Sequence, residues 1–306
     1  MLGVAIHPYL LILNKNKNLK LKKAYQETIE LLREAYDLNE ATSITRLLFE
    51  ELELDHMMVF THPDYVLSEY KHHALSEFRS KLLKRIPVQY VLGYTWFHDH
   101  KLLVGPGCLI PRPETEELIY RLLEEKHDFK RVLDIGTGSG CLAISIRAEF
   151  PEARVWAMDK YPETLEWAKK NASLNKQRIN FIIDDILDPA YEKYPADFDL
   201  VVSNPPYVRK SEKKNMHNNV LENEPFTSLF VEDADPLVFY RAIHDFCIEK
   251  LKPGGHLFLE INEALGKETA ELYNDAYFED VEILKDIHNK DRFIKAYRNE
   301  QEKKRR

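Results

Sequence analysis

The chain of 306 residues is long enough for two domains and a sizeable hydrophobic core. Its hydrophobic fraction of 44% and charged fraction of 31% are typical of a soluble globular protein, and its formal net charge of −8 argues against sequence-independent binding to nucleic-acid backbones. Three cysteines without metal-ligand spacing argue for a reducing compartment and against a disulfide framework.

Both ends of the chain are expected to lie outside the folded part. Residues 1–19 contain a short apolar run interrupted by His7 and Pro8, followed by alternating Asn and Lys. The segment lacks the basic start of a signal peptide, and its apolar run is too short to span a bilayer. We therefore predict that residues 1–19 are a poorly ordered leader, without membrane association. Residues 301–306 are predicted to be a basic, solvated tail. We expect a cytoplasmic protein.

Residues 20–85 show the periodicity of a small helical bundle. Apolar residues recur every three or four positions between Leu21 and Tyr36, which predicts a first amphipathic helix. Asn39 is expected to cap a second helix, and Pro63 is expected to begin a third. The second helix is predicted to bury Ile44, Leu47, Leu48 and Leu52.

Residues 86–110 change character and are predicted to form a β-hairpin that links two domains. The expected short strands are Val88–Leu92, Thr95–Phe97 and Lys101–Val104. His98 and His100 flank an aspartate between two of these strands, so turn residues are a simpler interpretation than metal ligands. No metal site is predicted.

Residues 111–300 alternate between strand and helix patterns. The helices include one that begins at Glu114 or Thr115 and one over Cys141–Phe150. This alternation predicts an α/β domain with a doubly wound, Rossmann-like parallel sheet and an antiparallel last strand. The predicted strands are Arg131–Asp134, Val155–Met158, Asn180–Ile183, Phe198–Ser203, His256–Ile261, Val281–Asp286 and Phe293–Tyr297.

A glycine-rich turn follows the first of these strands. Gly136, Gly138 and Gly140 allow a ligand to approach the backbone at the start of a helix. Asp159 ends the next strand, nineteen residues beyond Gly140, a distance at which an acidic residue accepts hydrogen bonds from ribose hydroxyls. A nucleoside cofactor is therefore predicted at this edge of the sheet.

Two residues favour S-adenosylmethionine over a dinucleotide as this cofactor. Cys141 occupies the position where the dehydrogenase fingerprint has a third Gly or Ala. Asp134 adds a negative charge where a pyrophosphate would bind, whereas it would attract a cationic sulfonium compound with a free amino group. A nicotinamide dehydrogenase is the more distant alternative.

A rigid corner follows the strand Phe198–Ser203, formed by Asn204, Pro205, Pro206 and Tyr207. The two prolines end the strand and restrict the backbone. An amide oxygen, a proline carbonyl and an aromatic ring together suit a planar NH2 group, which has two hydrogens to donate and a flat face. The alternative is an ordinary turn, because Asn and Pro are common turn residues.

Four motifs together resemble the HemK/PrmC family of release-factor glutamine methyltransferases. They are Pro87–Gly93, Pro111–Glu116, Asp134–Gly140 and Asn204–Tyr207, and the similarity extends from about Lys22 to Arg298. The resemblance implies methyl transfer from S-adenosylmethionine to the N5 atom of the glutamine in the Gly-Gly-Gln motif of class I peptide chain release factors. The resemblance also implies that release factors are the protein partners and that residues 20–85 form the substrate-docking domain. The enzyme is expected to be a monomer.

The resemblance also assigns site residues. Asn204 and Pro205 are expected to be catalytic, and Asn204, Pro205, Pro206 and Tyr207 are expected to bind the substrate glutamine. Ile186 stands where the family often has an aromatic residue. The implied cofactor contacts are Gly136, Thr137, Gly138, Ser139, Gly140, Asp159, Asp185, Ile186 and Asn204.

Two alternative functions remain open from the residues alone. The corner at Asn204 would also suit adenine N6 or guanine N2, which makes a nucleic-acid amino methyltransferase the main alternative. The net charge and the lack of a basic, aromatic-rich patch argue against it. A non-catalytic cofactor-binding protein on the same scaffold is the other alternative, although it would have no need for two converging acceptors.

Overall fold

The computed structural model describes residues 18–299, so the predicted basic tail and all but the last two residues of the predicted leader lie outside the described residues. Leu19, within the predicted leader, is buried. The chain divides between Leu92 and Gly93 into two compact units. No helix among the described residues is long and apolar enough to cross a bilayer.

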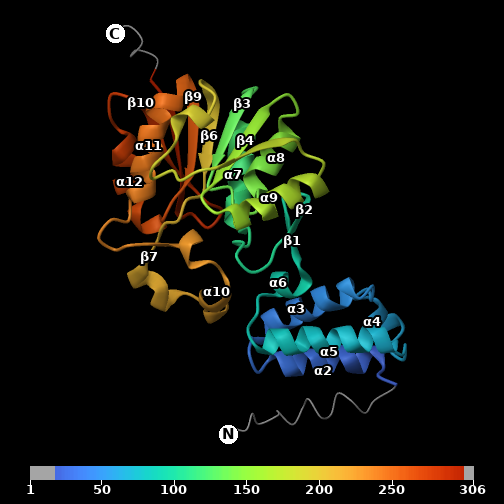
Figure 1. Ribbon diagram of the computed structural model, residues 1–306. Helices are drawn as coiled ribbons and strands as arrows, with labels where there is room; N and C mark the ends of the chain where they lie inside the picture. Colours follow the sequence, from blue (N-terminus) through green and yellow to red (C-terminus); the bar gives the residue numbers. More distant parts are fainter. Residues whose placement is uncertain (1–17, 300–306) are drawn as a thin grey trace. The chain divides into compact units, whose positions relative to one another are not determined.

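The first unit is helical (Figure 1). A buried arginine joins two of its helices, because Arg79 donates to the Thr28 hydroxyl at 3.0 Å and to the Ala24 carbonyl at 2.8 Å. Burial lowers the pKa of Arg79 to about 10. The helices of this unit are α2 (Leu21–Leu32), α3 (Leu38–Glu51), α4 (Met58–Thr61), α5 (Glu69–Leu83) and α6 (Val88–Leu92).

Several details predicted for this region are wrong. The cap of α3 is Asp37 and not Asn39, because the Asp37 carboxylate accepts the Glu40 amide at 2.9 Å. Ser68 caps α5, which begins at Glu69, six residues after the predicted start at Pro63. The segment Val88–Leu92 is a helix and not a strand.

The side-chain pattern explains these errors. Leu47 is 40% exposed although it was expected in the core, because only one stripe of a surface helix faces its neighbours. Val91 is buried among the helices of the first unit, so its apolar neighbours serve helix packing and not a sheet. Tertiary contacts override the β-propensity of such a short run.

The second unit begins with the hairpin β1 (Tyr94–Phe97) and β2 (His100–Leu103), whose antiparallel pairing matches two of the three predicted strands. His98 and Asp99 have positive φ angles, as expected for turn residues. The hairpin is held to α9 (Pro162–Leu174), where the Asn171 side chain exchanges hydrogen bonds with Leu103 N at 2.6 Å and Leu103 O at 3.0 Å.

A seven-stranded sheet forms the centre of this unit in the order β10-β11-β9-β6-β3-β4-β5 (Figure 1). Only β11 runs antiparallel to its neighbours, which confirms the doubly wound sheet with an antiparallel last strand. The strands are β3 (Arg131–Ile135), β4 (Arg154–Asp159), β5 (Ile179–Ile183), β6 (Phe198–Ser203), β9 (Leu251–Glu260), β10 (Phe278–Lys285) and β11 (Asp291–Arg298).

Helices cover both faces of the sheet and create two apolar cores (Figure 1). α7 (Pro113–Glu124), α8 (Cys141–Glu149) and α9 pack on one face. α11 (Val238–Lys250) and α12 (Gly266–Tyr273) pack on the other. A peripheral segment contains β7 (Val208–Arg209), α10 (Asn218–Asn223) and β8 (Phe230–Val231), with β7 and β8 paired in parallel.

The strand order has a switch point at β3. From β3 the chain proceeds outward through β4 and β5, and then returns to β6 on the other side of β3. Ligands of open α/β sheets bind at the carboxyl ends of the strands at such a point. Ile135, Asp159, Ser203 and Glu260 are the last residues of four neighbouring parallel strands at this edge.

Candidate active site

A cavity of about 770 Å³, partly open to solvent, lies at this edge of the sheet. The cavity brings together most of the residues predicted from the sequence, which come from the ends of β3, β4, β5 and β6. The predicted residues that line it are Gly136, Gly138, Asp159, Asp185, Ile186, Asn204, Pro205 and Pro206.

A smaller cavity of about 390 Å³ shares Gly136, Gly138 and Asn204 with the first. It is lined by Thr137 and Ser139 from the glycine-rich turn and also by Asp134 and Arg112. The two cavities together thus extend from the predicted ribose-binding acid to the predicted sulfonium-binding region.

The glycine-rich turn has a conformation that other residues rarely adopt. Gly136 and Gly138 have φ angles of 70° and 57°, in the left-handed region that favours glycine. Gly140 has a packing role in addition, since a Cβ there would lie 3.2 Å from Ala168 Cβ on α9. Gly140 does not line either cavity in the structure.

Asp134 is buried at the base of the turn. Its Oδ2 accepts the Thr137 hydroxyl at 2.6 Å and the Ala143 amide at 3.2 Å, whereas its buried Oδ1 has no hydrogen-bond partner among the described residues. Burial raises the pKa of Asp134 to about 7, against the lowering effect of the Thr137 hydrogen bond. An unpartnered buried carboxylate oxygen beside a cavity is suited to a cationic group of a ligand.

Asp159 ends β4 and is held by the backbone. Its two oxygens accept the Gly138 and Tyr161 amides, each at 3.0 Å. Burial raises the pKa of Asp159, and these amides oppose that rise. Each carboxylate oxygen can accept more than one hydrogen bond, so both retain capacity for ligand hydroxyls.

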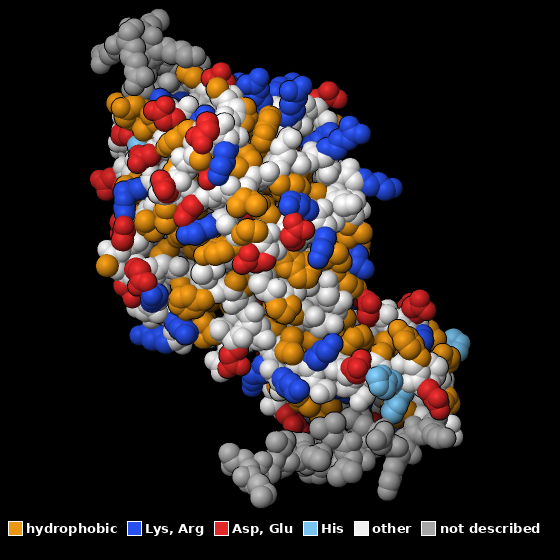
Figure 2. Space-filling view, viewed as in Figure 1, with side chains coloured by type: hydrophobic (Ala, Val, Ile, Leu, Met, Phe, Trp, Pro, Cys, Tyr) orange, Lys and Arg blue, Asp and Glu red, His pale blue; other side chains and the backbone are white. Residues whose placement is uncertain are grey.

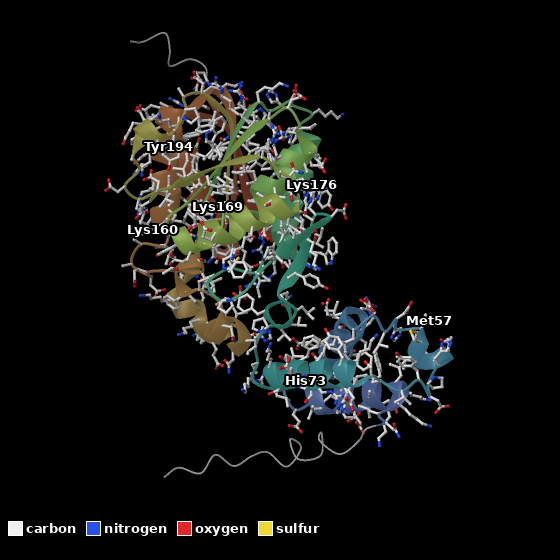
Figure 3. All side chains as sticks on the ribbon, turned by 45° about the vertical axis from the view of Figure 1, so that its right-hand side comes forward. Met57, His73, Lys160, Lys169, Lys176 and Tyr194 are labelled. Carbon is white, nitrogen blue, oxygen red and sulfur yellow. The ribbon has the colours of Figure 1, made fainter. Side chains whose placement is uncertain are left out.

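Asp185 and Lys160 form an ion pair at 2.7 Å beside the cavity. Figure 3 labels Lys160 near one end of α9 and Lys176 near the other, and Lys160 belongs to the loop that joins β4 to α9. Ile186 is buried and packs in the apolar core that includes Met158.

The corner at Asn204 is tied to two distant segments. Asn204 Nδ2 donates to Thr115 Oγ1 at 3.0 Å, and the Thr115 hydroxyl donates to Glu260 Oε2 at 2.6 Å. The Tyr207 hydroxyl donates to the other Glu260 oxygen at 2.9 Å. Neither Asn204 Oδ1 nor the Pro205 carbonyl accepts a hydrogen bond from residues 18–299.

Tyr207 does not line the cavity, and its ring packs against the apolar core beneath the corner. Burial raises the pKa of Tyr207 well above its usual value, reinforced by the negative charge of Glu260. The stacking of a substrate against this ring therefore stays a prediction.

An ion pair with a buried carboxylate holds the segment that approaches the cavity before α7. Glu224 accepts the Arg112 guanidinium at 2.7 Å and the Ile110 amide at 3.0 Å. The carboxylate side chain is 1% exposed, so it is strongly shielded from water. This contact fixes the residues before Thr115 relative to the loop between β7 and β8.

Sequence reasoning did not assign a role to three residues of this region. Thr115 was considered only as a helix start and as part of the motif Pro111–Glu116, Lys160 was not singled out, and Glu260 was included only in the predicted strand His256–Ile261. A signal for Glu260 was present, because it is an acidic residue directly after the apolar run Leu257–Leu259. No group of three or more His, Cys, Asp or Glu side chains suited to a metal ion occurs among the described residues.

Comparison with known proteins identifies relatives along nearly the whole chain. Residues 114–224 match the family model "Methyltransferase small domain", and residues 23–93 match "PrmC N-terminal domain". The release factor glutamine methyltransferase of Bacteroides thetaiotaomicron is 40% identical over 87% of this chain and 96% of its own length. That of Flavobacterium psychrophilum is 40% identical over 90% of this chain and 98% of its own length.

Among solved structures, the ribosomal protein L11 methylase of Lactobacillus delbrueckii subsp. bulgaricus is similar with a TM-score of 0.44 and 18% identity. The match covers 64% of this chain and 84% of that chain, and it bears on neither substrate nor mechanism. The relatives at 40% identity span both units of the molecule. This chain belongs to the release factor glutamine methyltransferase family.

Proposed function

We propose that this protein methylates the side-chain amide nitrogen of the glutamine in the Gly-Gly-Gln motif of class I peptide chain release factors, with S-adenosylmethionine as methyl donor. The names of its relatives support this substrate. The observation that carries the proposal is the position of Asn204 and Pro205 in the same cavity as Asp159. In this proposal the Asn204 side-chain oxygen and the Pro205 carbonyl are the two acceptors for the substrate amide.

The residues of the cavity fit S-adenosylmethionine. The buried, unpartnered Oδ1 of Asp134 suits its ammonium group, and Asp159 suits its ribose hydroxyls. Gly136 and Gly138 leave room for close approach along the backbone, and Ile186 offers an apolar surface for the adenine. We further propose that Thr137, Ser139, Gly140, Asp185 and Asn204 support this binding site.

The chemical difficulty is that an amide nitrogen is a poor nucleophile, because its lone pair is delocalised into the carbonyl. When bound, S-adenosylmethionine supplies an electrophilic methyl group on a positively charged sulfur. Asn204 Oδ1 and the Pro205 carbonyl accept the two N–H groups of the substrate glutamine and orient its nitrogen. The same two oxygens stabilise the positive charge that develops on that nitrogen.

The other two predicted substrate contacts are Pro206 and Tyr207. Pro206 lines the cavity and stiffens the corner, and we propose that Tyr207 offers its ring to the flat face of the glutamine amide. No His or Lys lies within Asn204–Tyr207 to remove a proton beforehand. Proton loss from the nitrogen therefore follows bond formation in this proposal.

We propose that the helical unit, predicted over residues 20–85, docks the release factor, and that the enzyme acts as a cytoplasmic monomer without direct contact to nucleic acid. On the visible face of the α/β unit, basic and acidic side chains are interspersed (Figure 2). This distribution and the net charge of −8 favour a protein substrate over a nucleic-acid backbone.

The test is incubation of the purified protein with methyl-labelled S-adenosylmethionine and three kinds of acceptor. The acceptors are a purified class I release factor, the same factor with its Gly-Gly-Gln glutamine replaced by alanine, and total RNA with DNA. We expect one methyl group on the glutamine side chain by peptide mass spectrometry and no label in the other two samples. Label in nucleic acid alone would establish the exocyclic-amine alternative, and binding of cofactor without any labelled acceptor would indicate a non-catalytic protein.

A further inference from the structure

The anchor of Asn204 continues into the protein interior through a chain of hydrogen bonds. Asn204 Nδ2 donates to Thr115 Oγ1, which donates to Glu260 Oε2, and Tyr207 donates to Glu260 Oε1. Glu260 is 1% exposed and Thr115 is 2% exposed. These hydrogen bonds join the first turn of α7, the end of β9 and the corner after β6, which are far apart in the sequence.

The direction of each hydrogen bond follows from the chemistry of the groups. An ionised carboxylate only accepts, so both Glu260 oxygens require donors, and the single hydroxyl hydrogen of Thr115 is directed to one of them. The Thr115 oxygen can then only accept from Asn204. The Asn204 amide must therefore present its NH2 to Thr115, which leaves its carbonyl oxygen as the branch that does not contact Thr115.

We propose that Glu260, acting through Thr115, is a positioning residue that fixes which way the Asn204 amide faces. An asparagine side chain has nearly the same shape in its two flipped orientations, so shape alone does not choose between them. The wrong orientation would offer a donor to the substrate amide instead of an acceptor. This inference rests on the proposed function, in which the Asn204 oxygen receives a substrate N–H.

The burial of Glu260 indicates that this chain of hydrogen bonds serves function more than stability. A buried carboxylate is costly for folding unless it is well paired. Within 18–299 its direct partners are two neutral hydroxyls, and the Arg292 guanidinium acts on it only as a nearby charge. Hydrogen bonds in such a chain also polarise one another, which increases the acceptor strength of the Asn204 oxygen.

The test uses substitutions that preserve shape. Thr115→Val removes the hydroxyl, Thr115→Ser retains it, and Glu260→Gln keeps the shape but supplies an NH2 that can donate to Thr115. Thr269→Val is the matched control, because Thr269 is fully buried in α12 and, among the described residues, its hydroxyl bonds only to the Leu265 carbonyl at 2.7 Å. Thermal denaturation of each variant separates lost stability from lost positioning.

We expect kcat toward the release factor to fall about 100-fold in Thr115→Val and Glu260→Gln, since misplacing one preorganised group costs about that factor. The Kd for S-adenosylmethionine should change less than about threefold, and Thr115→Ser should recover most of the rate. Thr269→Val should lose stability as Thr115→Val does but retain kcat. A kcat near that of the wild type in Thr115→Val, or an equal loss in Thr269→Val, would overturn the proposal.

A second measurement does not depend on any methyl acceptor. The side-chain NH2 resonances of Asn204, assigned by their loss in Asn204→Ala, should show slow hydrogen exchange in the wild type. They should lose this protection in Thr115→Val and Glu260→Gln. Unchanged protection of the Asn204 NH2 group in both variants would refute the positioning role, whatever the substrate proves to be. If the wild type failed to methylate the release factor but the two variants did lose this protection, only the proposed function would be refuted.

Discussion

The two ends of the active-site cavity are built in different ways. The end around Gly136 and Asp159 is formed within one strand–helix–strand unit, since the glycine-rich turn bonds to its own strand and to the end of the next strand. The end around Asn204 depends on Thr115 and Glu260, which lie far away in the sequence. Changes at the first end should therefore alter cofactor binding, and changes at the second should alter the rate of the chemical step.

The largest expected effect belongs to Asn204→Ala. Loss of one of the two acceptors for the substrate amide should lower kcat by at least about 100-fold. The Kd for S-adenosylmethionine, measured by calorimetry, should rise less than about tenfold, because the glycine-rich turn and Asp159 are intact. A variant with wild-type turnover would contradict the assignment of Asn204.

Asp159→Ala should show the opposite pattern. Removal of a carboxylate that accepts hydrogen bonds from the hydroxyls of a ligand lowers the affinity for that ligand roughly tenfold to 100-fold. We expect the Kd for the cofactor to rise by this factor while kcat at saturating cofactor stays within about threefold of the wild type. Equal losses in kcat and affinity would remove the distinction between the two ends.

Asp134→Asn should weaken cofactor binding about tenfold and remove its pH dependence. Burial raises the pKa of Asp134 to about 7, and only the ionised carboxylate attracts an ammonium group, so wild-type affinity should decrease as the pH falls below about 7. In the variant, affinity measured between pH 6 and pH 8 should stay constant. An unaltered pH profile would mean that another group controls binding.

The same variant should gain stability in the absence of cofactor. The folded-state pKa of Asp134 lies above its value of 3.8 in the unfolded chain, so the wild type loses stability as the pH rises from about 4 to about 7. Asp134→Asn should therefore be more stable at pH 8 by about 1–2 kcal/mol, and the difference should shrink toward pH 4. Urea unfolding at both pH values measures it, and a less stable variant at pH 8 would contradict the burial penalty.

Lys160→Met should have the smallest effect. The Lys160 side chain is 52% exposed, and exposed ion pairs contribute about 1 kcal/mol or less. The Kd for the cofactor should change less than about threefold, with the change reduced further at high salt. A tenfold change in this Kd would indicate that Lys160 contacts the cofactor directly, in addition to its ion pair with Asp185.

Much of the α/β unit was predictable because its elements are encoded locally. The all-buried strand Phe198–Ser203, the glycine-rich turn and the two prolines after Ser203 all restrict the backbone over a few residues. The helical unit was less predictable in detail. The starts of α3 and α5 depend on Asp37 and Ser68, and the segment Val88–Leu92, predicted as a strand, is a helix that packs in the core of the helical unit.

The sequence by itself determined the strand ends, the acids that follow them and the corner at Asn204, because strand and turn propensities act between near neighbours. Only the tertiary structure decided that Thr115 and Glu260 meet beneath Asn204. That meeting requires β6 and β9 to be adjacent and α7 to begin beside their carboxyl ends. Strand order is set by the burial of both faces of the whole sheet, and a linear pattern of residues does not contain it.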